Sequence, residues 1–171
     1  MKLPESVYKA PVVFLLGMPM SGKSKMGKAL AREKQCEFLD TDVAIEQEQN
    51  ASIQEIFKFK GENYFRGLEK DWIENFKPQN PVVVATGGGM PCFFDNMTLF
   101  NKKGLTVYLN IPLGMIIQRA ALSVNRPLFE NKSPEELKEF IQQLYNKRHP
   151  IYMQSQVILS PGEPAEKTGQ I

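Results

Sequence analysis

The stretch that decides the fold reads VVFLLGMPMSGKS and runs from Val12 to Ser24. Its first five residues are apolar without alternation, which is typical of a strand buried on both faces of a parallel sheet. Gly17 to Ser24 then matches the phosphate-binding loop pattern, with a glycine near each end followed by a lysine and a hydroxyl residue. Such a loop joins a buried strand to a helix, so that backbone N–H groups converge on phosphate oxygens. We therefore expect a nucleotide-binding α/β domain.

The rest of the chain repeats the alternation of short apolar runs and helical patterns. Further strands are expected at 37–39, 82–85, 106–109 and 156–159. Lys23 to Lys34 contains helix formers and ends on cations, and Ser52 to Glu55 has the pattern of a capping box. Strands that alternate with helices indicate βαβ units with parallel pairing. The sequence predicts a three-layer α/β/α fold with a five-stranded parallel sheet.

Length and composition limit the other classes of protein. A chain of 171 residues is the usual size of one domain, and 42% hydrophobic with 23% charged residues is typical of a globular protein. The net charge of +2 is too small to indicate a nucleic-acid partner, and no apolar run is long enough to span a membrane. Cys36 and Cys92 are too few for a disulfide framework. We expect a single domain over 1–171, monomeric and cytoplasmic, without a nucleic-acid or membrane partner.

The phosphate loop predicts specific contacts to a nucleotide. Lys23 is placed to reach the β- and γ-phosphates, and the Ser24 hydroxyl to ligate a magnesium ion that bridges them. The pattern itself does not separate GTPases, ATPases and small-molecule kinases. A guanine-reading Asn-Lys-x-Asp sequence is missing, since Asn101-Lys102-Lys103 is followed by Gly104. The small size also favours a kinase acting on a metabolite.

Two carboxylates, Asp40 and Asp42, follow the second expected strand. If this segment is extended, both side chains lie on one side of it, because alternate residues of a strand share a face. Asp40 would then hold the magnesium shell through water, and Asp42 would accept a proton from the attacking hydroxyl. The alternative is that an aspartate here caps a helix that starts near Val43.

Five motifs in order resemble the shikimate kinase family over about Val12 to Leu159. They are Asp40-Thr41-Asp42; Ile56-Phe57 with Gly61-Glu62, Phe65-Arg66 and Glu69; Thr86-Gly87-Gly88-Gly89; Arg126-Pro127-Leu128; and Lys147-Arg148 before Pro150. The second motif is similar to the shikimate-binding segment of that family. The resemblance implies a P-loop kinase fold with a substrate-binding helical segment at about 41–76 and a mobile lid at about 123–133.

The residue chemistry agrees with this resemblance. Arg66 and Arg148 can each grip a small carboxylate with a planar fork, and Glu69, three residues after Arg66 on a helix, can hold its guanidinium. Each arginine taken alone could instead be a surface ion pair. Gly87 to Gly89 lets a ligand approach bare backbone, although a tight turn is the simpler alternative.

The lid and the nucleoside end complete the expected site. Arg126 in the lid would bring its charge onto the phosphates and help exclude water. Arg119 matches a family position that packs against adenine, although a solvated helix face would explain it too. ATP contacts are thus expected at Gly17, Met20, Ser21, Gly22, Lys23, Ser24, Lys25, Arg119 and Arg126; acceptor contacts at Asp42, Arg66, Gly87, Gly88, Gly89 and Arg148; magnesium contacts at Ser24 and Asp40; and catalytic roles for Lys23, Asp42 and Arg126.

Two features depart from the family pattern. Met20 stands where the family usually has glycine, and a side chain there resists a positive φ and adds bulk near the phosphates. The chain also ends soon after the proline-containing stretch 160–164, so that a last helix would be cut short.

The resemblance implies transfer of the γ-phosphoryl group of ATP, with Mg²⁺, to the 3-hydroxyl of shikimate in aromatic amino-acid biosynthesis. Two alternatives stay open at this point. One is a related kinase for another small hydroxylated metabolite such as gluconate, and the other is a nucleotide-binding protein without catalytic activity.

Overall fold

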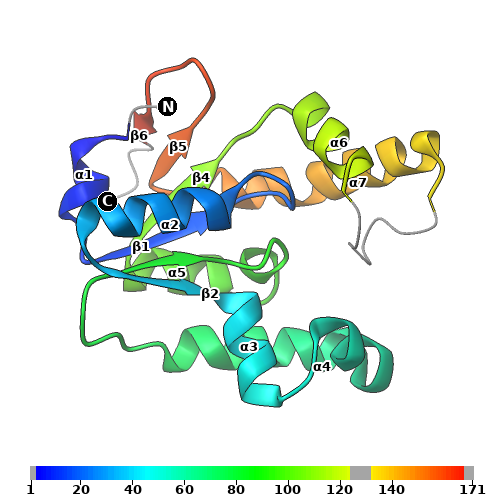
Figure 1. Cartoon of the computed structure of the whole chain (residues 1–171), viewed down its shortest axis with the longest axis horizontal. Coiled ribbons are helices and arrows are strands. Elements are labelled where there is room, and N and C mark those ends of the chain that lie inside the picture. The colour runs from blue at the N-terminus through cyan, green and yellow to red at the C-terminus, as the bar shows by residue number, and fades with distance from the viewer. Residues whose placement is uncertain (1–2, 124–131, 168–171) are drawn as a thin grey trace.

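The structure is a computed structural model that describes residues 3–123 and 132–167 (Figure 1). Its sheet has the strand order β2-β3-β1-β4-β5-β6. Strands β1 to β5 pair in parallel, as predicted, and β6 adds a short antiparallel edge to β5. The strands are β1 (Val12–Leu16), β2 (Glu37–Asp40), β3 (Val82–Ala85), β4 (Leu105–Leu109), β5 (Val157–Leu159) and β6 (Glu166–Lys167).

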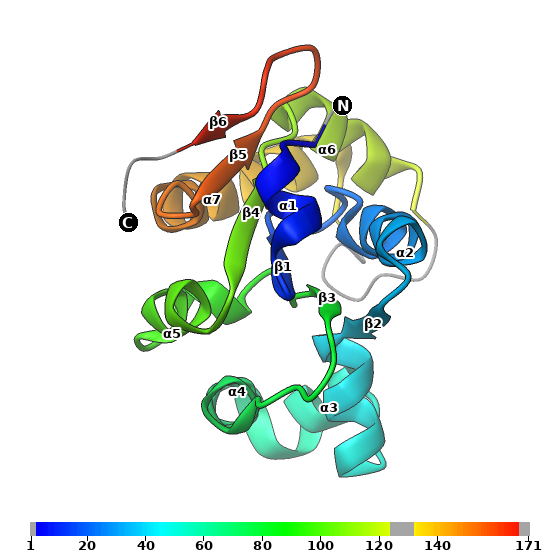
Figure 2. The ribbon, with the colours of Figure 1, turned by 90° about the vertical axis from the view of Figure 1, so that its left-hand side faces the viewer.

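Helices lie on both sides of this sheet. Figure 2 shows α2 on one side and α5 and α7 on the other, as a three-layer arrangement requires. The helices are α1 (Glu5–Lys9), α2 (Lys23–Lys34), α3 (Thr41–Gln49), α4 (Ile53–Asn75), α5 (Asn96–Lys103), α6 (Leu113–Ala121) and α7 (Pro134–Tyr152), with a 3₁₀ turn η1 (Met90–Cys92) after β3. The expected helix over Lys23–Lys34 is confirmed, and so is the capping box at Ser52 and Glu55.

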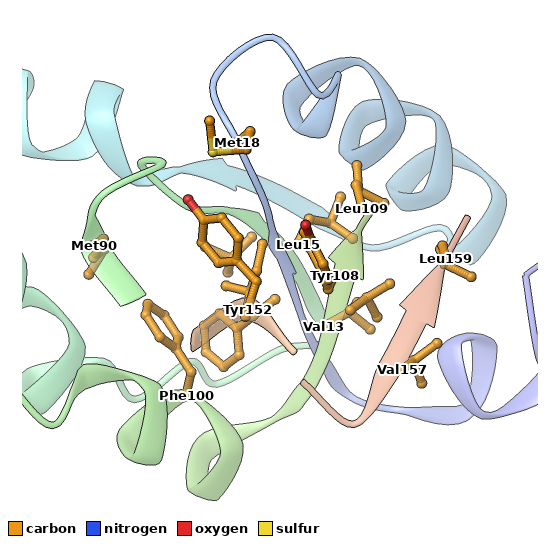
Figure 3. Packing of buried hydrophobic residues seen from close by; sticks show 14 of the residues in the cluster. Val13, Leu15, Met18, Met90, Phe100, Tyr108, Leu109, Tyr152, Val157 and Leu159 are labelled. Atoms are coloured by element: carbon orange, nitrogen blue, oxygen red, sulfur yellow. The ribbon is translucent and has the colours of Figure 1, made fainter. Parts of the chain in front are cut away.

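The core consists of the central strands and the helices packed on them. All side chains of β1 and β3 are buried, which explains the lack of polar alternation in these runs. Figure 3 shows part of the cluster, with Tyr108 from β4 and Tyr152 from α7 among the large side chains. A smaller cluster around Ile45, Ile56 and Phe65 packs α3 against α4.

A kink divides α4 into two helical segments. Gly61 has φ 82° and ψ 170° inside this helix, a conformation that side chains with a Cβ rarely adopt. The second segment therefore begins right after Gly61. Glu62, Arg66 and Glu69 follow at spacings of four and three residues, so they share one face of this segment.

Two expectations concern segments at the margins of the described residues. Most of the expected lid, 124–131, and with it Arg126, lies outside the part of the chain that the structure describes. After β5, where a shortened last helix was expected, the described residues form a turn and then β6. No helix among the described residues is long and apolar enough to cross a membrane.

The short helix α1 is fixed to the C-terminal end of α2. The ammonium group of Lys34 donates hydrogen bonds to the carbonyl oxygens of Val7, Tyr8 and Ala10, which end α1. The Tyr8 hydroxyl donates to the Glu33 carboxylate at 3.0 Å, and Val7 is fully buried. A cation on the free carbonyls of a helix end is favourable, because these carry partial negative charge.

We predict that Lys34→Ala lowers the free energy of unfolding by about 1–2 kcal/mol, because three carbonyl groups lose a charged donor. Urea unfolding followed by circular dichroism measures this change. The matched control is Lys9→Ala, which removes only an exposed ion pair with Glu5 and should leave the midpoint unchanged. Equal effects of the two substitutions would contradict the prediction.

Candidate active site

The phosphate loop lies between β1 and α2, as predicted. Lys23 is the first residue of α2, and its ammonium group donates to the carbonyl oxygens of Gly17 and Met18 at 2.9 and 3.0 Å. The Ser21 hydroxyl is buried in this loop, and no hydrogen-bond partner for it lies among the described residues. A buried donor of this kind, next to the N-terminus of a twelve-residue helix, fits an anion such as a nucleotide phosphate.

Met20 adopts the left-handed conformation that its position requires, with φ 67°. The expectation that a non-glycine residue meets a positive φ here is confirmed. The carbonyl oxygen of Met20 accepts a hydrogen bond at 2.9 Å from the guanidinium of Arg119, at the end of α6. Arg119 is therefore part of the loop environment and not a solvated residue on a helix face.

Asp40 and Asp42 lie in a different local structure from the one expected. Asp40 ends β2 and caps α3, since its Oδ1 accepts from the N–H of Asp42 at 3.2 Å. The prediction of an extended segment with both carboxylates on one side was wrong, because the capping bond turns the chain into a helix at Thr41. The alternative, that an aspartate here caps the helix, is confirmed. The Oδ2 of Asp40 also accepts from the Ser24 hydroxyl at 2.7 Å, and its role at a magnesium ion stays a prediction.

The pair formed by Ser24 and Asp40 tests whether the residues fit a magnesium ion. Mg²⁺ prefers oxygen ligands and keeps several waters, so one hydroxyl and one carboxylate beside a phosphate site suffice. Among the described residues there is no group of three or more His, Cys, Asp or Glu side chains that could hold a metal by themselves. The oxygen pair at the loop fits an ion that is held mainly by the nucleotide.

The glycine loop after β3 brings the other expected residues together. A Cβ atom on Gly87 would collide with Oδ1 of Asp42, and one on Gly89 would lie 2.6 Å from a guanidinium nitrogen of Arg66. At Gly88 it would lie 3.3 Å from a guanidinium nitrogen of Arg148 and 3.1 Å from Pro19 of the phosphate loop. The three glycines therefore serve close approach by charged side chains, in addition to forming a turn.

Two residues that sequence reasoning did not identify hold this glycine loop in place. The N–H of Gly87 donates to the buried Thr41 hydroxyl at 2.7 Å. The hydroxyl of the fully buried Tyr152 donates to the carbonyl of Gly88. In the sequence Thr41 is visible only as the residue between two aspartates, and Tyr152 as an ordinary core aromatic.

Arg66 is buried in a cage of carboxylates and aromatic rings. Its guanidinium donates to Glu69 at 2.6 Å and to Glu62 at 3.0 and 3.2 Å, and it stacks over the ring of Phe93 at 4.1 Å. The predicted contact with Glu69 is confirmed, whereas Phe93 gave no signal in the sequence. Held by the buried Glu69 and stacked on Phe93, the guanidinium keeps a fixed orientation, which suits recognition of a planar anion.

Burial changes the acidity of two carboxyl groups in this site. Desolvation raises the pKa of Glu69 to about 7, although Arg66 acts in the opposite direction. Desolvation also raises the pKa of Asp42, helped by the negative charge of Asp40 and opposed by Lys23 and Arg66. A carboxyl group with a raised pKa is a better proton acceptor than an ordinary one, which matches the role expected for Asp42.

A cavity of about 640 Å³ extends from the phosphate loop on the side of Arg119. Its lining includes Met20, Ser21, Gly22 and Lys25 from the phosphate loop and the start of α2, Leu109 at the end of β4, and Ile111. Leu3 and Tyr8 of the N-terminal segment also border it. Arg119 lines this cavity as well, and its place at the nucleoside end of the site stays a prediction.

The fold and this site define a class of protein, the P-loop phosphotransferases that act on small molecules. The family model for shikimate kinase matches residues 19–169. A shikimate kinase from Phocaeicola vulgatus is 40% identical over 156 residues, which cover 91% of this chain and 89% of that protein. One from Clostridium botulinum is 38% identical over 149 residues, which cover 86% and 85%.

Solved structures agree with the sequence relatives. The crystal structure of the shikimate kinase from Bacteroides thetaiotaomicron matches with a TM-score of 0.84 and 38% identity, over 88% of this chain and 86% of that one. The shikimate kinase from Acinetobacter baumannii, in complex with shikimate, matches with a TM-score of 0.81 and 29% identity, over 94% and 88%. The chain belongs to the shikimate kinase family. Its activity is the ATP-dependent phosphoryl transfer of that family.

We predict opposite tolerance for two substitutions of Met20. Glycine adopts a positive φ without strain, so Met20→Gly should change the KM for ATP by no more than about threefold. A β-branched residue is a genuine outlier in this conformation, so Met20→Val should raise the KM for ATP at least about tenfold. Steady-state kinetics at saturating acceptor measure both. Similar values for the two variants would show that the backbone at Met20 is not constrained.

A second prediction follows from the raised pKa of Glu69. Between pH 4.5, its ordinary pKa, and about pH 7, the folded protein binds this proton more tightly than the unfolded chain. The stability gained from Glu69 is thus fully present below about pH 4.5 and is lost as the pH rises towards 7. As the pH rises over this range, the free energy of unfolding of the wild type should therefore fall relative to that of Glu69→Gln.

Urea unfolding at several pH values measures that difference. Glu74→Gln, in an exposed pair with Lys70 on the same helix, is the matched control and should show no comparable shift. A difference between wild type and Glu69→Gln that is independent of pH would overturn the assignment.

Proposed function

We propose that the chain transfers the γ-phosphoryl group of ATP to the 3-hydroxyl of shikimate with the residues described above. The observation that carries the proposal is the convergence of Asp42, Arg66 and Arg148 on Gly87–Gly89, with Pro19 of the phosphate loop against Gly88. An acceptor held by these three side chains lies directly beside the place where the loop binds phosphate. Phosphoryl transfer requires this proximity, because donor and acceptor must meet in line.

On the donor side, the phosphate loop with Ser21, Gly22 and Lys25 holds ATP. Lys23 exchanges its contacts with the loop carbonyls for the β- and γ-phosphates, where its charge stabilises the transition state. Ser24 and, through water, Asp40 would hold a magnesium ion that accompanies the nucleotide. When bound, such an ion would supply positive charge against the phosphates. Arg119 packs at the nucleoside end, and Arg126 from a lid at 123–133 closes over the phosphates.

On the acceptor side, the segment 41–76 binds shikimate. Arg66 and Arg148 take its carboxylate with their planar forks, and the backbone of Gly87, Gly88 and Gly89 approaches its ring. Asp42 accepts a hydrogen bond from the attacking hydroxyl and takes its proton as the bond to phosphorus forms. The raised pKa of Asp42 supports this role. Positioning of donor and acceptor supplies most of the rate enhancement. We take the domain that does this to span 1–171.

The alternatives from the sequence have less support. A kinase for gluconate would keep the phosphate loop, but it does not explain two arginines and an aspartate placed against three glycines. A protein that only binds nucleotide would have no need of this acceptor site. The monomeric state and the cytoplasmic setting remain predictions.

We predict that Asp42→Asn lowers kcat with shikimate at least about a hundredfold, because the amide cannot accept the proton. The KM for ATP should stay within about twofold of the wild type, since Asp42 is placed on the acceptor. A coupled assay of ADP release measures both constants. Asp71→Asn, an exposed carboxylate on α4, is the control and should behave as wild type. An unchanged kcat for Asp42→Asn would remove the proposed base.

A further inference from the structure

The contact between Glu62 and Arg66 occupies one recognition edge of the guanidinium. Both Nε and Nη2 of Arg66 donate to the same oxygen, Oε1 of Glu62, at 3.2 and 3.0 Å. This edge of an arginine is one that a ligand carboxylate uses in a two-bond contact. A glutamate of the protein therefore stands where an anionic acceptor needs to bind.

The other side of Arg66 is committed to a carboxylate that cannot easily leave. Glu69 accepts from Nη1 at 2.6 Å and its side chain is 1% exposed, while the side chain of Arg66 is 9% exposed. Glu62, in contrast, is 54% exposed and follows the kink at Gly61. Glu62 can therefore leave Arg66 and be solvated by water, whereas Glu69 would remain buried without a partner.

The charges around Arg66 make this movement necessary. Glu62 and the ionised form of Glu69 both face the one guanidinium of Arg66, so a carboxylate from the acceptor would find the charge of Arg66 already compensated. Among the described residues, Arg148 adds a further positive charge at the glycine loop. An acceptor carboxylate gains a full contact with Arg66 only after Glu62 has released it. The apparent affinity for the acceptor is therefore lowered in proportion to the fraction of molecules in which Glu62 still contacts Arg66.

We propose that Glu62 competes with the carboxylate of the acceptor for Arg66 and thereby sets the affinity for the acceptor. This inference rests on the proposed function, in which Arg66 binds that carboxylate. Glu62 is then neither a positioning residue for Arg66 nor a plain surface pair between residues four apart on a helix. The three roles differ in the sign of their effect on acceptor binding.

Two variants of Glu62 separate the contact from its charge. Glu62→Gln removes the charge, and Glu62→Asp keeps the charge but shortens the side chain by one methylene, which weakens its two-bond contact with Arg66. If Glu62 competes, both variants lower the KM for shikimate by about two- to fivefold at unchanged kcat and unchanged KM for ATP. Calorimetric titration of the enzyme with shikimate should show the same gain in affinity.

Each other pattern would overturn the inference. A higher KM in both variants would mean that Glu62 orients Arg66, and an unchanged KM that the pair is only a surface contact. A lower KM in Glu62→Gln alone would be a general effect of charge. The carboxamide of shikimate, which lacks the anion, serves as a control ligand, and the variants should bind it no better than the wild type does.

A third variant, Arg66→Lys, distinguishes a failure of this inference from a failure of the proposed function. Lysine lacks the planar fork, so this variant should raise the KM for shikimate if Arg66 binds the acceptor. If Arg66→Lys has no effect, the assignment of Arg66 itself is wrong. If Arg66→Lys raises the KM and the Glu62 variants do not lower it, the assignment of Arg66 holds and only the competition is excluded.

Discussion

The bare backbone of Gly87 to Gly89 is the constraint on which the rest of the site depends. It follows the central strand β3, and each of its three glycines lies against a different charged side chain from a different part of the chain. A Cβ atom at any of these positions would push away Asp42, Arg148 or Arg66, or the phosphate loop at Pro19. The Thr41 hydroxyl accepts from the N–H of Gly87 and the Tyr152 hydroxyl donates to the carbonyl of Gly88, and these two hydrogen bonds fix this backbone. The acceptor site and the phosphate loop thus share one rigid element.

Buried charge is the second organising feature. Arg66 loses most of its water, and the carboxylates of Glu69 and Glu62 and the ring of Phe93 replace that solvation. Removal of Glu69, whose side chain is 1% exposed, would leave the guanidinium of Arg66 without its buried counter-charge, whereas the more exposed Glu62 is not essential to this compensation. The same burial raises the pKa of Glu69 and of Asp42, which links acid–base chemistry to the packing of α3 against α4.

Sequence reasoning predicts best where one local pattern determines one structure. The strand Val12–Leu16 and the helix Lys23–Lys34 follow from apolar runs and from the loop between them, and both are confirmed. The local structure at Asp40 was predicted wrongly, because a pattern of alternate residues does not show a capping bond. Its single carboxylate both caps α3 and contacts Ser24. Tyr152 and Phe93 could not be predicted, since their contacts with Gly88 and Arg66 depend on how distant segments pack. The strand β6 was not predicted, because two residues are too few to show a periodic pattern.

The central claim is that the acceptor is shikimate, held by its carboxylate beside the phosphate loop. ADP release from ATP and Mg²⁺ by the 171-residue chain, with shikimate, with gluconate and without acceptor, tests it most directly. We expect release that depends on shikimate and stays at background with gluconate or with no acceptor. Release with gluconate alone would contradict the assignment of Arg66 and Arg148, and nucleotide binding without release for either acceptor would contradict catalysis by this site.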